Sequence, residues 1–370
     1  MKNCGYSRAV LAIPALVSAA ALITASVLLS GCYTLKQGTV MLGYLGRAVP
    51  LEELAGQYAA EEDARTGESE KTRRFVELVQ DIRCFAIEEL GLKNSKNYTR
   101  YVKLDRDYLA AVVSASAADS FTPHEWHYPV AGTMPYKGFF NVEDARKERA
   151  KLEKRGLDVW IRGVDAFSTL GWFRDPLYSY MRDYPPHRLA DLIIHEQFHA
   201  TVFIKGQVQF NEELAEFIGG EGARLYMESR FGADSEEYRA MIAAEAENKA
   251  YVDFLRELSA ELEAVYAGSA DRNAKLREKE RVINAAGERF DAEYSRRFST
   301  GNYRGFSQLP VNNAYLELYR LYHEGGGYFQ DLYQQSGKNL SAFIAAAKTV
   351  KKGTVSPKVQ FAAALGLHTF

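Results

Sequence analysis

The chain has 370 residues, of which 47% are hydrophobic, 12% aromatic and 25% charged, as in a folded globular protein. This composition excludes a disordered chain, a collagen-like chain and a membrane protein with several spans. Lys and Arg number 46 and Asp and Glu number 48, so the net charge is −2 and no positive field would attract nucleic acid. We therefore expect no nucleic-acid partner.

The first 31 residues have the layout of a secretory signal peptide. Lys2 and Arg8 supply positive charge, and residues 9–29 are apolar or small without any charge. Residues 29–32, Leu-Ser-Gly-Cys, resemble the bacterial lipobox, in which the cysteine is acylated and the signal peptide is cleaved just before it. The resemblance implies a lipid-anchored protein that begins at Cys32. The alternative is a transmembrane anchor, because the apolar run is long enough to span a bilayer.

A lipid anchor would place the protein in the cell envelope, attached to a membrane without spanning it. Tyr33, not Asp, follows Cys32, which resembles an outer-membrane address and predicts the periplasmic face of that membrane if the host is Gram-negative. We expect a tether over 32–50 and a single domain over 51–370. Only Cys84 would remain as a free thiol in the processed chain, so we expect no intramolecular disulfide.

The pattern of apolar residues predicts a predominantly helical α+β fold. Apolar residues recur every three or four positions from 70 to 90, which predicts a helix ending near Gly91. Aromatic and β-branched residues then predict one small sheet in the region 98–173, interrupted by a charged helix at 142–154. The predicted strands are 98–104, 108–114, 124–130, 136–140 and 157–164. After Pro185 the chain is mostly helical, and the charged stretch 236–298, broken at Gly268, predicts a helical hairpin.

The strongest chemical motif is His195-Glu196-Gln197-Phe198-His199, where the predicted sheet ends and the helices begin. On a helix, a spacing of four residues places both imidazoles on one face, so they can bind one metal ion. Glu196 would then reach a water on that metal as the catalytic base. The alternative is a helix with two packed or solvated histidines. The apolar flanks disfavour it, because buried His and Glu side chains need partners.

The acidic segment after His199 offers a third ligand. Residues 211–215, Asn-Glu-Glu-Leu-Ala, resemble the Asn-Glu-x-x-Ala element of gluzincin metallopeptidases, and this resemblance implies Glu212 as the third zinc ligand. Glu216, one turn later, would orient a histidine or would itself be the ligand, and Glu213 and Glu221 are further alternatives. A solvated acidic helix start would explain the cluster without a metal. The two metal helices are predicted over 186–230, with one zinc ion and an open coordination position.

Several segments together resemble a family of bacterial proteins known as putative aminopeptidases. They are the lipobox, residues 132–140 and 167–177, the two metal elements and residues 312–314. The resemblance implies a zincin-like catalytic domain and a zinc-dependent peptidase, and the family label implies an aminopeptidase. The sequence departs from aminopeptidase N-type enzymes, because the distance from His199 to Glu212 is shorter and the Gly-x-Met-Glu-Asn element is absent.

Other polar residues could assist such a reaction. The oxyanion that forms during peptide hydrolysis needs a hydrogen-bond donor to stabilise it. Tyr322 and His323 are candidates, in a segment that also contains Tyr315 and Tyr319. The segment 157–173 is either an edge strand along which a peptide substrate lies or an ordinary core strand. His124 and His127 would face opposite sides of a strand, which disfavours a second metal site.

The sequence thus predicts a lipid-anchored zinc peptidase that acts on peptides in the cell envelope. The alternative is a non-catalytic envelope lipoprotein that keeps the fold and binds a partner. Glu196 favours the enzyme, because a binding protein has no need of a carboxylate at that position.

Overall fold

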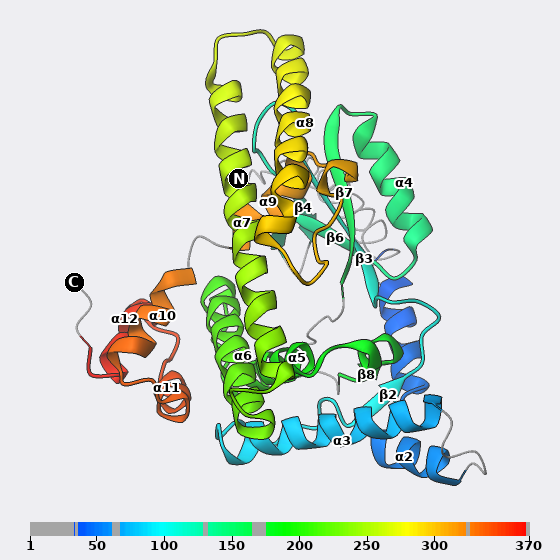
Figure 1. Ribbon diagram of the computed structural model, residues 1–370, viewed down its shortest axis with the longest axis vertical. Helices are drawn as coiled ribbons and strands as arrows, with labels where there is room; N and C mark the ends of the chain where they lie inside the picture. Colours follow the sequence, from blue (N-terminus) through cyan, green and yellow to red (C-terminus); the bar gives the residue numbers. More distant parts are fainter. Residues whose placement is uncertain are drawn as a thin grey trace, which may run out of the picture.

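The computed structural model describes residues 33, 36–60, 67–128, 132–164, 175–322 and 326–367. Most of these residues are helical, and the strands of the largest sheet lie between α4 (Val142–Glu153) and the pair of long helices α7 (Glu236–Ala267) and α8 (Arg272–Arg297) (Figure 1). The predominantly helical α+β class is therefore confirmed. The signal segment, Cys32 and His323 lie outside the described residues.

The described strands form three small sheets, so the prediction of one sheet is wrong. The largest has the order β6 (Tyr136–Phe139), β3 (Ala110–Ala117), β7 (Leu157–Val164), and both pairings are antiparallel. A second joins β1 (Val49–Pro50), β2 (Arg100–Val102) and β8 (Leu177–Tyr178), and a third pairs β4 (Trp126–Tyr128) with β5 (Gly132–Met134). The charged segment 103–107 follows β2 directly and separates it from β3.

Helices cover both faces of the largest sheet. On one face Ala111, Val113 and Val159 pack against α4 (Val142–Glu153), which begins at the N-cap Asn141. On the other face the Trp160 ring lies 4.6 Å from that of Tyr315 on α9 (Asn313–Tyr322). Strand β7 is an edge strand, as one of the two predictions for 157–164 required. Binding of a substrate along it stays a prediction, and residues 165–174 lie outside the described part.

Two long helices form the predicted hairpin. Helix α7 (Glu236–Ala267) starts at the N-cap Ser235, and α8 (Arg272–Arg297) starts at the N-cap Asp271, just after the Gly268 break. The helices lie side by side (Figure 1), and their rings pack between them, with Phe254 and Phe290 centroids 4.8 Å apart. The buried Lys279 of α8 pairs with Asp158 of β7, which joins the hairpin to the sheet.

The main hydrophobic core surrounds the two helices that carry the sequence motif. Helices α3 (Gly67–Glu88), α5 (Pro186–Thr201) and α6 (Val208–Phe231) all contribute buried side chains to it. On the far side of α6 pack α10 (Gly326–Gln335), α11 (Leu340–Ala347) and α12 (Pro357–Ala364) (Figure 1). The remaining described elements are α2 (Leu51–Ala60) and two 3-10 helices, η1 (Ser179–Asp183) and η2 (Phe306–Gln308).

The segment predicted as a tether, 32–50, is folded over its described part. Residues 36–46 are helical, β1 follows, and the buried Tyr44 belongs to the main core. This part of the chain therefore packs on the protein instead of forming a free linker. Among the described residues, no helix combines the length and the apolar character needed to cross a membrane.

Candidate metal centre

Helix α5 places the His195 motif in the core of the protein. Pro185 and Pro186 start the helix, where proline loses no hydrogen bond. Leu189, Ile193 and Ile194 are fully buried and anchor the apolar side of the helix. The packing of these side chains holds α5 in place, and with it the His195 motif that the helix carries.

Glycines on α6 allow that helix to approach α5 closely. A Cβ atom on Gly219 would lie 2.4 Å from Asp191 Oδ1 and 3.1 Å from His195 Cβ, and one on Gly222 would lie 2.9 Å from Ile194 Cγ2. These distances are shorter than normal van der Waals contacts, so a side chain at either position would push the helices apart. Gly219 and Gly222 thus lie against α5, whereas Gly220 faces open space.

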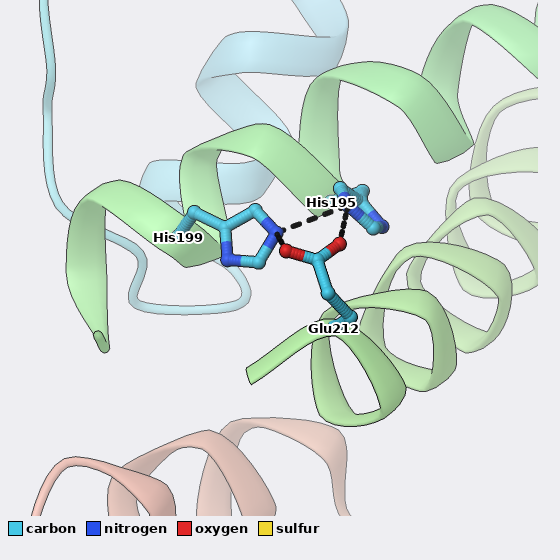
Figure 2. Close-up of side chains that lie close together, drawn as sticks. All are labelled: His195, His199 and Glu212. Carbon is cyan, nitrogen blue, oxygen red and sulfur yellow. Dashed lines mark hydrogen bonds and ion pairs between the residues drawn. The ribbon is translucent and has the colours of Figure 1, made fainter. Parts of the chain in front are cut away.

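The close approach brings His195, His199 and Glu212 together (Figure 2). The two Nε2 atoms lie 3.1 Å apart, and the Glu212 carboxylate lies 3.4 Å from His199 Nε2 and 3.8 Å from His195 Nε2. One ligand atom from each side chain lies within 4.8 Å of the others. Two imidazoles and one carboxylate therefore converge on a common point and could hold a metal ion.

The protonation states of these side chains suit metal binding. Burial and, to a smaller extent, the neighbouring His199 together lower the pKa of His195 to about 4, although the charge of Glu212 acts in the opposite direction. Burial acts to raise the pKa of Glu212, but the hydrogen bond and charge of His199 outweigh it, and the pKa is lowered. At neutral pH His195 is neutral and Glu212 is ionised, which are the forms that bind metals.

Backbone contacts and an asparagine hold the group in place. His195 donates a hydrogen bond to the backbone carbonyl of Ala215 on α6. Asn211, 2% exposed, accepts a hydrogen bond from the Ile204 amide (3.0 Å) and donates one to the Ile204 carbonyl (2.9 Å). Asn211 thereby fixes the loop between the two helices one residue before Glu212. The sequence motif contains Asn211, but nothing in the sequence showed that its partner would be Ile204.

Glu196 lies on the same helix and is 7% exposed. It neighbours Tyr98, whose pKa is raised well above its ordinary value, first by burial and then by the charge of Glu196. Tyr98 has a positive φ of 57°, which is uncommon for a residue other than glycine. Its amide donates a 2.7 Å hydrogen bond to the Asp175 carbonyl. No signal in the sequence indicated that Tyr98 would lie beside Glu196.

The alternative acidic ligands do not belong to the group formed by His195, His199 and Glu212. Glu213 pairs with Lys358 of α12 at 2.8 Å. Glu216 is exposed, and its pKa is raised by partial desolvation and by the charges of Glu212 and Glu213. The hydrogen bond of His195 goes to a backbone carbonyl, so the orienting role predicted for Glu216 is filled there by Ala215. Glu221 belongs to the next turn of α6.

The predicted oxyanion donors occupy α9 and the residues after it. Tyr315 is buried and hydrogen-bonded to Tyr251, and its hydroxyl lies 3.4 Å from that of Tyr319. Tyr322 is the last residue of α9, and its side chain, like His323, lies outside the described atoms.

Comparison with known proteins identifies the family. A family model described as "Putative aminopeptidase" matches residues 32–360, which is most of the chain. The chain belongs to this family. The family name suggests peptidase activity, in agreement with the resemblance seen in the sequence. Comparison with curated proteins and with solved structures gives no match.

Proposed function

We propose that this member of the family is a zinc-dependent peptidase attached to the cell envelope, with its metal held by His195, His199 and Glu212. The convergence of these three side chains carries the proposal. Zinc binds ligand atoms at about 2.0–2.1 Å in tetrahedral geometry, so two of its ligand atoms should lie about 3.3 Å apart. The observed separations of 3.1, 3.4 and 3.8 Å bracket that value.

The chemistry of the donors also supports zinc. Two histidines and one carboxylate form the ligand set of catalytic zinc sites, which keep a position open for substrate. The buried Nδ1 atom of His199 has no hydrogen-bond partner among the described residues. Its Nε2 atom, which faces His195 and Glu212, is the atom available to a metal ion. A structural zinc site is disfavoured, because such sites use four protein ligands and favour cysteine.

In this proposal Glu196 moves the proton. Zinc, when bound, supplies a Lewis acid that polarises a peptide carbonyl and acidifies water. The Glu196 carboxylate takes a proton from the attacking water and passes it to the nitrogen of the departing amine. The Ala215 carbonyl keeps the His195 ring oriented, and Asn211 keeps Glu212 at the start of α6. We propose that the enzyme removes residues from the amino end of a peptide, because the family name suggests an aminopeptidase.

The test replaces the base without altering the metal ligands. Glu196→Gln keeps the shape of the side chain, so zinc content and melting temperature should match those of the parent. Turnover of a peptide library should fall by about 10²- to 10⁴-fold, because the amide cannot accept the proton. Glu228→Gln, an exposed position at the other end of α6, is the matched control and should keep full activity. Comparing peptides with free and acetylated amino ends then separates aminopeptidase from endopeptidase activity.

Two outcomes would contradict this proposal. Unchanged turnover in Glu196→Gln would remove Glu196 from the reaction. A parent protein that holds zinc but cleaves no peptide would favour the non-catalytic binding protein.

Membrane attachment is the second part of the proposal. Its support is the uncharged run 9–29 followed by Leu-Ser-Gly-Cys at 29–32. An acylated Cys32 would hold the protein on an envelope membrane, on the periplasmic face of the outer membrane in a Gram-negative host. The proposed peptidase activity and the proposed lipid anchor rest on different observations, so one can be correct if the other is wrong.

A further inference from the structure

The described chain begins on one particular face of the protein. The Tyr33 hydroxyl donates a hydrogen bond to the Gly138 carbonyl of β6, and its ring lies 5.6 Å from that of Phe139. Cys32 is the next residue toward the amino terminus, and consecutive Cα atoms are about 3.8 Å apart. The segment proposed to attach to the membrane therefore joins the protein at β6, with no spacer between them.

The helix over 36–46 beside this point has an unusual surface. Lys36 is its only charged residue, whereas α7 and α8 carry charges along their length. Leu42 is 58% exposed, and the neighbouring Gly38 and Gly46 are also exposed. Surface helices in water normally carry polar and charged residues on their outer side. This helix instead exposes Leu42 and three glycines, with Lys36 and Thr39 as the polar residues among its exposed positions.

An apolar cavity adjoins the helix. It has a volume of about 320 Å³, and aromatic and methionine side chains dominate its lining, among them Tyr33, Met41, Tyr128, Met134, Tyr136 and Phe140. Tyr136 is 37% exposed at its rim. Tyrosine side chains favour the boundary between lipid and water, because the ring is apolar and the hydroxyl is polar. The composition of this face thus suits the interfacial region of a bilayer.

Two of the cations near this face are paired. Lys36 forms an ion pair with Asp144, and Lys137 lies 3.8 Å from Glu148. The exposed Arg47, just after the helix, lies over the Tyr44 ring and has no carboxylate partner among the described residues, so the excess positive charge of this face is small. We expect its binding to depend little on anionic lipid or on salt.

We propose that the helix over 36–46, with its exposed Leu42, and the adjoining cavity, lined by Met134 and Tyr136, form a face that lies in the interfacial region of the lipid bilayer. This proposal rests on the membrane attachment proposed above and is independent of the peptidase activity. The direct junction at Tyr33 holds this face at the membrane, and the low charge of the helix, in which Lys36 is the one charged residue and is paired with Asp144, lowers the cost of contact with lipid.

A depth measurement on the full chain tests this proposal. Leu42→Cys and Val355→Cys, each combined with Cys84→Ser, carry an environment-sensitive fluorophore, and the proteins are reconstituted in phosphatidylcholine vesicles that contain a lipid-borne quencher. Both positions are exposed and apolar, at 58% and 50%, so neither change should disturb the core. Val355 is the matched control, because it precedes α12 on the other side of the molecule (Figure 1). Melting temperatures of both variants should equal that of the Cys84→Ser parent.

The proposal predicts loss of emission at position 42, no loss at position 355, and the same result after addition of anionic lipid or salt. If the protein floats with the vesicles but neither label is quenched, the face is not at the membrane, and the anchor stands. Quenching of both labels would show unspecific adsorption and would also overturn the proposal. A protein that fails to float with the vesicles would overturn both the face and the anchor, while peptide cleavage would still report on the peptidase.

Discussion

Two adjacent glycines of α6 provide a sharp test of how the metal group is assembled. Gly219 faces α5, where a Cβ atom would lie 3.1 Å from both the Asp191 carbonyl oxygen and His195 Cβ. Gly220 has no atom within 4 Å of the corresponding position. Both Gly219→Ala and Gly220→Ala therefore add a methyl group to the same helix. The methyl group is crowded by α5 at position 219 and faces open space at position 220.

The expected magnitudes follow from these contacts. Replacing a glycine by alanine inside a helix stabilises it by about 1 kcal/mol, so Gly220→Ala should raise the free energy of unfolding by about that amount. Gly219→Ala gains the same helix preference, but the added methyl group must push α5 away, which costs about 1–3 kcal/mol. Gly219→Ala should thus be less stable than Gly220→Ala by about 1–3 kcal/mol.

The shift should also reach the metal ligands. A displacement of His195 relative to Glu212 should weaken zinc binding in Gly219→Ala by about tenfold or more, as found when the support of a metal ligand is disturbed. Urea unfolding of the metal-free variants measures the first effect, and competition with a zinc chelator measures the second. Equal stability and equal zinc affinity in the two variants would refute the close contact between α5 and α6.

The remaining predictions concern the ligands, their support, pH and attachment. Ala in place of Glu212 should remove stoichiometric zinc, whereas Glu216→Ala should keep it; the reverse result would exchange their roles. Asn211→Ala leaves the three metal ligands in place but should lower zinc affinity by about 10- to 100-fold, because the loop before Glu212 loses both hydrogen bonds to Ile204. Because the pKa of His195 falls from about 6.5 in the unfolded chain to about 4, the unfolded state binds more protons between these values. The metal-free protein should therefore lose up to about 3 kcal/mol of stability as the pH falls from 6.5 to 4, and a flat profile in urea titrations would contradict this. Cys32→Ser should block lipid labelling and signal cleavage, while Cys4→Ser should leave both unchanged; correct cleavage and normal detergent partitioning of Cys32→Ser would contradict the lipid anchor.

The sequence by itself determined the elements that depend on local pattern. The spacing of apolar residues and the Pro, Gly and Ser signals located α3, α5, α6 and the α7–α8 hairpin, because helix formation is decided within a few turns of chain. The four-residue spacing of His195 and His199 fixed their common face for the same reason. The neighbouring Asn211-Glu212 pair indicated the third ligand only through its resemblance to a known element.

Tertiary structure decided what depends on contacts between distant residues. Strand pairing divided the predicted sheet into three, because short strands take their partners from packing and not from their own pattern. The partner of His195, the Ala215 carbonyl, and the partner of Asn211, the Ile204 backbone, are main-chain groups that any residue type could supply, so no sequence signal marks them. The same holds for Tyr98 beside Glu196 and for Tyr33 on β6, which are brought to their neighbours by the fold of segments far apart in the chain.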